Sequence, residues 1–226
     1  QQRLLCVEMD NNYIYTGSDD TTIAVYNRTS LELIRLLPQH GMPVFDLATD
    51  SKYLYSASWD NTLGVWDKSR EFLLLARLQK HRDYLLSVYC DDQYIYTSSK
   101  DNTAIVWGKH DFRPLTVLKY HSSDVNSIFS DSNKIYTASS DGTVAIINKT
   151  TLTIIGRISG FDDAALQITS DNSRVYALLK GKVIITFRKD NMKSYEKILG
   201  PVDSTPGKMF VSPSYVYIGT ASGMLY

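Results

Sequence analysis

Short stretches of alternating apolar and polar residues recur along the whole chain, and turn-forming residues separate them. Between residues 44 and 78, four such stretches cover 44–49, 53–58, 62–67 and 72–78. They are rich in β-branched and aromatic residues, and none has the length and period of an amphipathic helix. The breaks between them, such as Asp50, Ser51 and Lys52, have the composition of turns. The pattern predicts four short antiparallel strands per unit and an all-β fold.

This four-strand unit repeats about every forty residues. Two residues recur with the same period: a tyrosine in the second predicted strand and an aspartate just before that strand. The tyrosines are Tyr15, Tyr55, Tyr96, Tyr136, Tyr176 and Tyr217, and the aspartates are Asp10, Asp50, Asp91, Asp131 and Asp171. A four-stranded antiparallel unit of this length is one blade of a β-propeller, in which neighbouring sheets bury each other's apolar faces.

We therefore expect one propeller domain over residues 1–226. Its blades should span about 1–39, 40–80, 81–120, 121–160 and 161–200, with a partial blade at 201–226.

Three of the units share a histidine, a serine and an aspartate at fixed spacing, and two of them add a tryptophan. Each histidine precedes its aspartate by 20 residues. The sets are His40, Ser58, Asp60 and Trp66; His81, Ser99, Asp101 and Trp107; and His121, Ser139 and Asp141, with Ile147 in the tryptophan place.

These repeats resemble the WD-repeat family, and the resemblance covers essentially the whole chain. It implies that the shared residues form a buried hydrogen-bond relay from the aspartate through the histidine and serine to the tryptophan. A relay of this kind is structural because it satisfies buried polar groups. Equivalent histidines in different blades cannot converge on one metal ion, so we expect neither a metal site nor a catalytic site.

Other units depart from this pattern. The first has Ser18 and Asp20 with Tyr26 in the tryptophan place, and the sixth has Ser222 in the aspartate place. The fifth replaces histidine, aspartate and tryptophan by Phe161, Gly181 and Phe187. We expect the fifth blade to be held by apolar packing of Leu166, Ile168, Tyr176, Leu178, Val183 and Ile185.

Propellers of the family usually have seven blades, and this chain holds between five and six periods. We therefore expect it to be part of a longer protein with a seven-bladed ring, with a six-bladed ring as the alternative.

The composition of the chain argues against several classes of function. Lys+Arg and Asp+Glu both number 24, so the basic excess typical of a nucleic-acid partner is missing. No apolar run approaches the length of a transmembrane helix, and we expect no membrane partner. The two cysteines, Cys6 and Cys90, are expected to be buried free thiols. No phosphate-binding loop or nucleophile motif is present, so we expect no cofactor and no enzymatic activity.

The resemblance implies a binding face paved by residues at the start of each first strand and by the residue before each turn aspartate. An exposed aromatic residue there would anchor a partner. Trp59 either serves in this way or folds onto its own blade, and Phe45 and Tyr84 share that ambiguity. The candidate partner-binding residues are Arg3, Phe45, Trp59, Tyr84, Lys100, Asp124 and Asn126.

These observations predict a non-catalytic scaffold that binds a protein or peptide, as a component of a multiprotein complex. The alternative is a structural or regulatory propeller appended to another module, such as a ubiquitin-ligase or signalling module. An enzymatic propeller would need acidic or histidine clusters that converge at the central channel, where only Asp124, with Asp163 nearby, is expected. We expect a cytoplasmic location, with the nucleus as the alternative.

Overall fold

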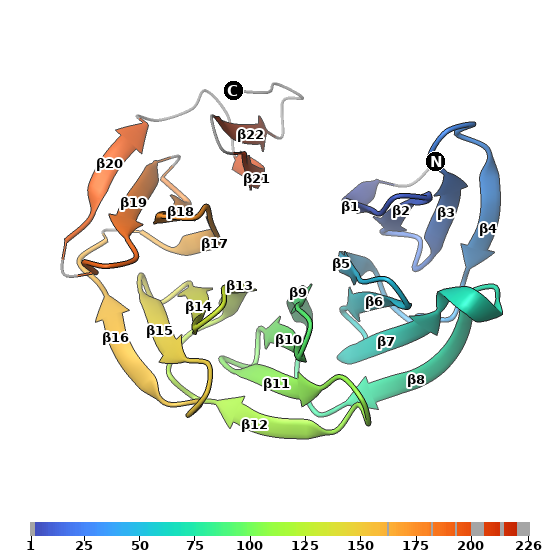
Figure 1. Cartoon of the computed structure of the whole chain (residues 1–226), viewed down its shortest axis with the longest axis horizontal. Helices are drawn as coiled ribbons and strands as arrows, with labels where there is room; N and C mark the ends of the chain where they lie inside the picture. Colours follow the sequence, from blue (N-terminus) through green and yellow to red (C-terminus); the bar gives the residue numbers. More distant parts are fainter. Residues whose placement is uncertain are drawn as a thin grey trace. The chain divides into compact units, whose positions relative to one another are not determined.

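The alternating stretches fold as antiparallel strands in the computed structural model (Figure 1). It describes residues 3–161, 163–181, 183–192, 194–199, 206–212 and 215–220. Among these residues lie five four-stranded sheets, one two-stranded sheet and one short 3-10 helix at Lys68–Arg70. The predicted all-β fold is confirmed, whereas Ser222 of the sixth unit lies outside the described residues.

The chain divides into two compact units, Gln1–Leu118 and Lys119–Tyr226. The N-terminal unit contains three sheets whose strands pair in chain order. The first sheet has β1 (Leu4–Met9), β2 (Tyr13–Ser18), β3 (Ile23–Asn27) and β4 (Leu33–Leu37); the second has β5 (Val44–Thr49), β6 (Tyr53–Ser58), β7 (Thr62–Asp67) and β8 (Leu73–Gln79); the third has β9 (Leu85–Cys90), β10 (Tyr94–Ser99), β11 (Ala104–Gly108) and β12 (Pro114–Leu118).

The C-terminal unit repeats the same design. Its fourth sheet has β13 (Val125–Ser130), β14 (Lys134–Ser139), β15 (Val144–Asn148) and β16 (Ile154–Ile158); its fifth has β17 (Ala165–Ser170), β18 (Arg174–Leu179), β19 (Ile184–Arg188) and β20 (Glu196–Leu199); a two-stranded sheet of β21 (Pro206–Val211) and β22 (Val216–Thr220) follows. That all of these sheets form one domain over 1–226 stays a prediction.

Within each unit the core lies between consecutive sheets. Tyr15 and Val25 of the first sheet pack with Val44, Leu54 and Trp66 of the second. In the C-terminal unit, the fourth and fifth sheets share a second core of the same kind. Full burial of each large apolar side chain contributes about 1.5–3 kcal/mol, so a sheet gains stability from its neighbour rather than from itself.

The repeated aspartate and tyrosine form a hydrogen bond with each other in every four-stranded sheet. The sequence pattern did not predict this bond. In the first sheet the Tyr15 hydroxyl donates to Asp10 Oδ2 at 2.7 Å, while Asp10 Oδ1 accepts the N–H groups of Asn12 and Tyr13. This side chain therefore closes the turn between the first two strands and satisfies a buried hydroxyl. The equivalent pairs are Tyr55–Asp50, Tyr96–Asp91, Tyr136–Asp131 and Tyr176–Asp171.

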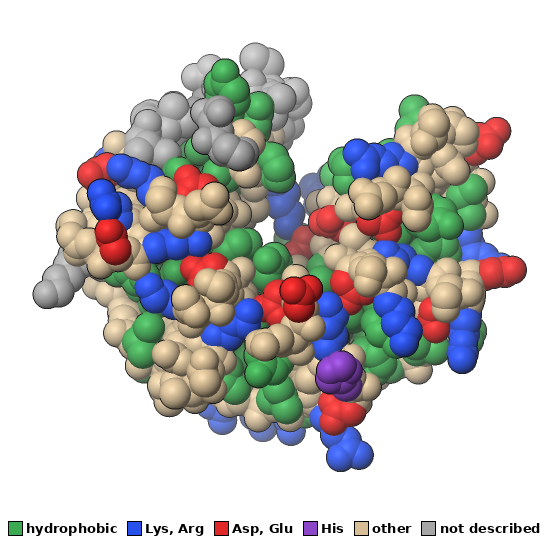
Figure 2. All heavy atoms as spheres, viewed as in Figure 1, with side chains coloured by type: hydrophobic (Ala, Val, Ile, Leu, Met, Phe, Trp, Pro, Cys, Tyr) green, Lys and Arg blue, Asp and Glu red, His purple; other side chains and the backbone are tan. Residues whose placement is uncertain are grey.

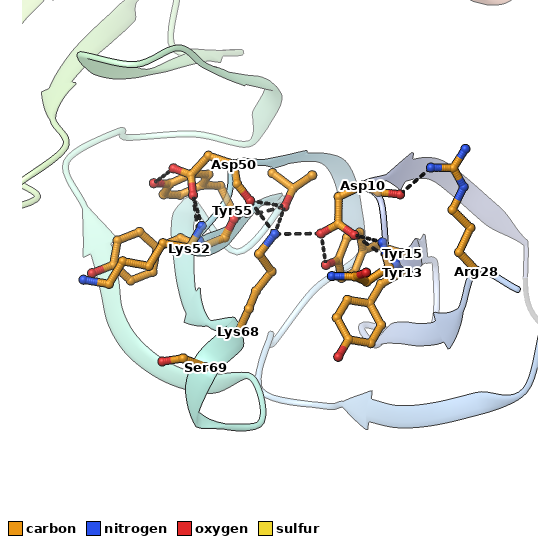
Figure 3. A network of polar contacts seen from close by, with 12 residues as sticks. Asp10, Tyr13, Tyr15, Arg28, Asp50, Lys52, Tyr55, Lys68 and Ser69 are labelled. Carbon is orange, nitrogen blue, oxygen red and sulfur yellow. Dashed lines mark hydrogen bonds and ion pairs between the residues drawn. The ribbon is translucent and has the colours of Figure 1, made fainter.

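A lysine from the following sheet joins this network. Figure 3 shows Lys68, in the turn after β7, reaching back to Asp10, with Nζ 2.6 Å from Oδ2. Burial alone would raise the pKa of Asp10, but the hydrogen bonds from Lys68 and Tyr15 outweigh it and lower the pKa to about 2. Lys109 contacts Asp50 at 2.8 Å and Lys189 contacts Asp131 at 3.1 Å, so the clasp between sheets recurs in both units.

Both cysteines are free thiols, as predicted, but only Cys6 is fully buried. Cys90 is half-buried at the end of β9, and its burial raises the pKa of the thiol to about 12. The thiol is therefore protonated and unreactive at neutral pH.

Candidate functional site

In the second sheet the relay histidine is held from both ring nitrogens. His40 Nδ1 lies 2.8 Å from Asp60 Oδ2, and Nε2 lies 2.6 Å from Ser56 Oγ. The Trp66 indole N–H donates to the same Ser56 oxygen at 2.8 Å. Gly64 gives this cluster its room, because a Cβ at that position would lie 2.5 Å from Ser56 Oγ.

The third sheet repeats the arrangement with threonine as the hydroxyl residue. His81 Nδ1 lies 2.9 Å from Asp101 Oδ2, and Nε2 lies 2.8 Å from Thr97 Oγ1. Trp107 Nε1 donates to Thr97 Oγ1 at 2.9 Å.

The fourth sheet has a shortened relay. His121 contacts Asp141 at 2.9 Å and Thr137 at 2.7 Å, and the buried Ile147 stands where the tryptophan lies in the other two sheets. The chain of bonds therefore ends at the threonine hydroxyl.

The relay hydroxyl is two residues earlier than the sequence analysis predicted. Ser58, Ser99 and Ser139 do not contact the histidines; Ser58 Oγ instead donates to Met42 O at 3.0 Å and accepts the Asp60 N–H at 3.1 Å. Residues two apart in a strand share a face, so the spacing alone could not separate the two hydroxyls. The serine at the end of the strand forms its hydrogen bonds within the turn. The hydroxyl residue inside the strand reaches the imidazole.

The relay groups use their hydrogen-bonding capacity on one another. Burial alone would raise the pKa of Asp60, but hydrogen bonds from His40 and Thr62 outweigh it and hold that pKa well below its usual range. In the fourth sheet, burial lowers the pKa of His121 despite the carboxylate of Asp141. Buried groups so fully paired stabilise the sheet and offer no free base to a substrate. Across the described ranges, no three His, Cys, Asp or Glu side chains gather as metal ligands.

The two sets of predicted face positions lie side by side because the backbone pairs them in each sheet. The Trp59 N–H donates to Pro43 O at 3.0 Å, and the Lys100 N–H donates to Tyr84 O at 2.9 Å. The same bond joins Asp19 to Arg3, Ser140 to Asp124, and Lys180 to Ala164.

A β-bulge lies near the start of the first strand in each four-stranded sheet. In β5 the register shifts between Val44 and Asp46, so Phe45 is the extra residue. The shift recurs in the other four-stranded sheets and places Leu5, Leu86, Asn126 and Leu166 at the bulge. A bulge re-aims its side chain, and in the second sheet it turns Phe45 toward Trp59.

Four predicted partner-binding residues form one continuous feature, which we call the aromatic row: Phe45, Trp59, Tyr84 and Lys100. Trp59 stacks on Phe45 with ring centroids 5.4 Å apart and on Tyr84 at 5.1 Å with an interplanar angle of 9°. Lys100 Nζ lies 5.4 Å from the centre of the Tyr84 ring. The three aromatic side chains are half-buried and Lys100 is exposed. Trp59 thus packs on its own sheet and on the next one; that it anchors a partner stays a prediction.

The other predicted face residues are separate from this row or belong to the other unit. Arg3 is exposed and pairs with Asp19 at 3.4 Å. Asn126 donates its amide N–H groups to Ser140 Oγ at 2.9 Å and to Ala165 O at 2.8 Å, so it ties the fourth sheet to the fifth. Asp124 is half-buried in the C-terminal unit.

Sequence reasoning missed the residue that follows each bulge. Asp46 Oδ2 accepts the Val88 N–H at 3.0 Å, and Ser127 Oγ accepts the Ile168 N–H at 3.2 Å. Gln167 bonds with both its amide groups to the backbone of Met209. These residues recur at the forty-residue period, and that recurrence was the available signal.

Charge is mixed on one face of the described part of the molecule (Figure 2). On the face drawn in Figure 2, basic and acidic side chains are interleaved over the sheets. None of the described residues belongs to a helix of the length and apolarity needed to cross a membrane.

The comparisons with known proteins agree with this geometry. A profile of the WD domain, G-beta repeat, matches residues 31–67, 72–108 and 112–148. Each match begins before the fourth strand of one sheet and ends with the third strand of the next, so the sequence repeat joins neighbouring sheets.

A chain in a crystal structure of a mitotic checkpoint complex superposes with a TM-score of 0.89, covering 99% of this chain and 73% of that chain at 15% identity. A search of curated proteins found no significant match. At 15% identity the structural likeness shows the fold alone. With three matched repeats, the chain belongs to the WD-repeat family and has its β-propeller fold.

Proposed function

We propose that this protein is a non-catalytic scaffold that binds a peptide or protein segment on the aromatic row. The observation that carries the proposal is the Phe45–Trp59–Tyr84 stack with Lys100 at its end. Half-buried aromatic side chains supply large contact area at low entropic cost, and such anchors carry most of the energy of protein interfaces.

The row is preorganised because its rings already pack against one another and span two sheets. A partner would therefore lose little free energy in ordering the site. The cation at the Tyr84 end favours a partner segment that places an acidic residue next to an apolar one. The chain of similar fold described above comes from a crystal structure of a mitotic checkpoint complex, which is consistent with a protein partner.

Two further features support a scaffold in a reducing compartment. The relay histidines and aspartates bond to each other, which leaves them structural rather than reactive. Both cysteines are free, which suits the cytoplasmic or nuclear location that the sequence analysis predicted.

The test is to select ligands from a displayed library of random peptides and to measure their affinity for variants of the full chain. Trp59→Ala should weaken binding by at least about tenfold. It should also destabilise the fold by about 1–2 kcal/mol, because two ring contacts are lost. Lys100→Ala should weaken binding and its salt dependence while leaving stability unchanged, since the side chain is exposed.

Lys52→Ala is the matched control. Lys52 Nζ lies 4.9 Å from the centre of the Tyr53 ring, so it forms a similar pair at the opposite end of the second sheet. Selected peptides that bind Trp59→Ala and Lys100→Ala as tightly as the unaltered chain would refute the aromatic row as the binding site.

A further inference from the structure

The fifth sheet lacks the whole relay and holds a cavity at the histidine and aspartate places. Phe161, Ala177, Gly181 and Phe187 stand at the histidine, hydroxyl, aspartate and tryptophan positions. A cavity of about 210 Å³ lies there within the C-terminal unit. Its walls include Phe161, Leu179, Val183 and Ile185, with the Tyr195 ring packed edge-on against Phe161 at 5.2 Å.

A carboxylate remains in this cavity, although it comes from a different position of the chain. Asp163 Oδ1 accepts the Ala164 N–H at 2.8 Å, and its other oxygen lies over Gly181. A Cβ on Gly181 would sit only 2.9 Å from Asp163 Oδ2. Among the described residues, Oδ2 accepts no hydrogen bond. The place that a relay aspartate would fill is therefore taken by Asp163.

The other sheets show what such a carboxylate contacts. In the second, third and fourth sheets the aspartate is 2.8–2.9 Å from an imidazole nitrogen. The fifth sheet keeps the carboxylate and the apolar surroundings but has no nitrogen-bearing ring, because phenylalanine stands in the histidine place.

Within the part of the chain that the structure describes, the cation at this cavity does not change the preference. Lys197 lies at the cavity edge, at the register position where Arg157 of the fourth sheet approaches Asp141 at 3.9 Å. Lys197 is exposed, so water screens its charge, whereas Asp163 is half-buried.

We propose that this cavity is a binding site for a ring-sized apolar molecule that carries an ammonium or N–H group, with the ring among the apolar walls and the nitrogen on Asp163. An apolar cavity of about 150 Å³ is large enough to hold benzene, so the volume suits one aromatic ring with a short substituent. The site is separate from the aromatic row and does not depend on the proposed scaffold function.

The test uses benzylamine, toluene and benzoate as probes of equal ring size, titrated into the full chain by calorimetry and by ¹⁵N-resolved NMR. Benzylamine should bind most tightly, with a dissociation constant in the millimolar range or below and shifts centred on residues 161–185. Asp163→Asn should weaken benzylamine by about tenfold and leave toluene unchanged. Val183→Phe, which fills the cavity, should abolish the binding of both.

Asp83→Asn is the matched control, because Asp83 accepts the Tyr84 N–H at 2.8 Å in the third sheet just as Asp163 accepts that of Ala164. It should leave benzylamine binding unchanged. Benzoate binding more tightly than benzylamine, or benzylamine binding that survives both Asp163→Asn and Val183→Phe, would overturn the proposal.

Discussion

The third and fifth sheets have the same four antiparallel strands, but they stabilise their interiors in opposite ways. The third sheet buries a complete polar relay from Asp101 through His81 and Thr97 to Trp107. The fifth sheet has apolar residues or glycine at all four places, and Ala177 and Phe187 are fully buried there. Replacement of the whole set teaches that the relay behaves as one unit, because a single remaining member would be an unsatisfied buried group.

The fourth sheet shows which member can be lost alone. It lacks only the tryptophan, and its Thr137 hydroxyl still bonds to His121. The indole is a donor at the end of the relay, so its removal leaves one hydroxyl lone pair unused. Removal of the histidine or the aspartate would leave partners on both sides unsatisfied.

The largest expected effect comes from breaking the third-sheet relay at its aspartate. Asp101→Ala removes the acceptor of His81, of the Arg82 N–H and of Thr103. We expect the free energy of unfolding to fall by about 3 kcal/mol, measured by urea denaturation. Asp111→Ala, in an exposed turn of the same sheet, is the control and should change it by less than about 0.5 kcal/mol. Equal effects of the two substitutions would mean that the relay adds nothing to stability.

Converting the third sheet to the fifth-sheet pattern sharpens the comparison. The combined variant His81→Phe, Thr97→Ala, Asp101→Gly and Trp107→Phe should lose about 2 kcal/mol, less than the sum of its four single substitutions. The combined variant should lose less stability because no polar member of the relay is left without a partner. Additive losses in denaturant titrations of all five variants would contradict the view that the relay is one unit.

The identity of the residue that supplies the relay hydroxyl predicts a smaller difference in the free energy of unfolding. Thr97→Val keeps the shape but leaves His81 Nε2 and the Trp107 indole without a partner, so we expect a loss of about 2 kcal/mol. Ser99→Ala should cost about 1 kcal/mol, because Ser99 bonds only to the turn, at Asp83 O and the Asp101 N–H. Thermal or urea unfolding would distinguish the two variants. A larger loss of stability for Ser99→Ala than for Thr97→Val would instead support the serine that the sequence predicted as the relay hydroxyl.

The smallest effect concerns the lysine clasp, which both units retain. Burial alone would raise the pKa of Asp50, but Lys109 and the turn N–H groups outweigh it and lower the pKa. A lowered carboxylate pKa adds stability above the unfolded value near 4, and this stability is lost as pH falls through the folded value. Lys109→Met should therefore cost about 1 kcal/mol at pH 7, and the difference from the unaltered chain should vanish between about pH 5 and pH 2.

Lys189→Met tests the same clasp in the C-terminal unit, where Lys189 contacts Asp131. The relay and the clasp lie at different ends of the sheets, so differences between the relays should not affect the lysine variants. The two lysine variants should therefore show the same pH dependence. A difference that persists at pH 2 would assign the effect to lost packing of the lysine stem rather than to charge.

Sequence reasoning located most of the strands because their alternation and turns are local properties. The strands predicted over 44–49, 53–58 and 62–67 coincide with β5, β6 and β7, and β8 begins one residue after the expected 72. It also grouped Phe45, Trp59, Tyr84 and Lys100 as candidates for one face, on positions implied by the family. It failed on the relay hydroxyl because Ser56 and Ser58 share a face of one strand.

The forty-residue period by itself determined the all-β fold, the four-strand unit and the partners twenty residues apart in the relay, since these depend on local periodicity and on spacing within one sheet. The tertiary structure alone decided which hydroxyl meets the imidazole, that a bulge turns Phe45 onto Trp59, and that Asp163 enters the space left by the missing aspartate. These depend on which atoms of adjacent strands and sheets come within contact distance, and the order of residues does not record that distance.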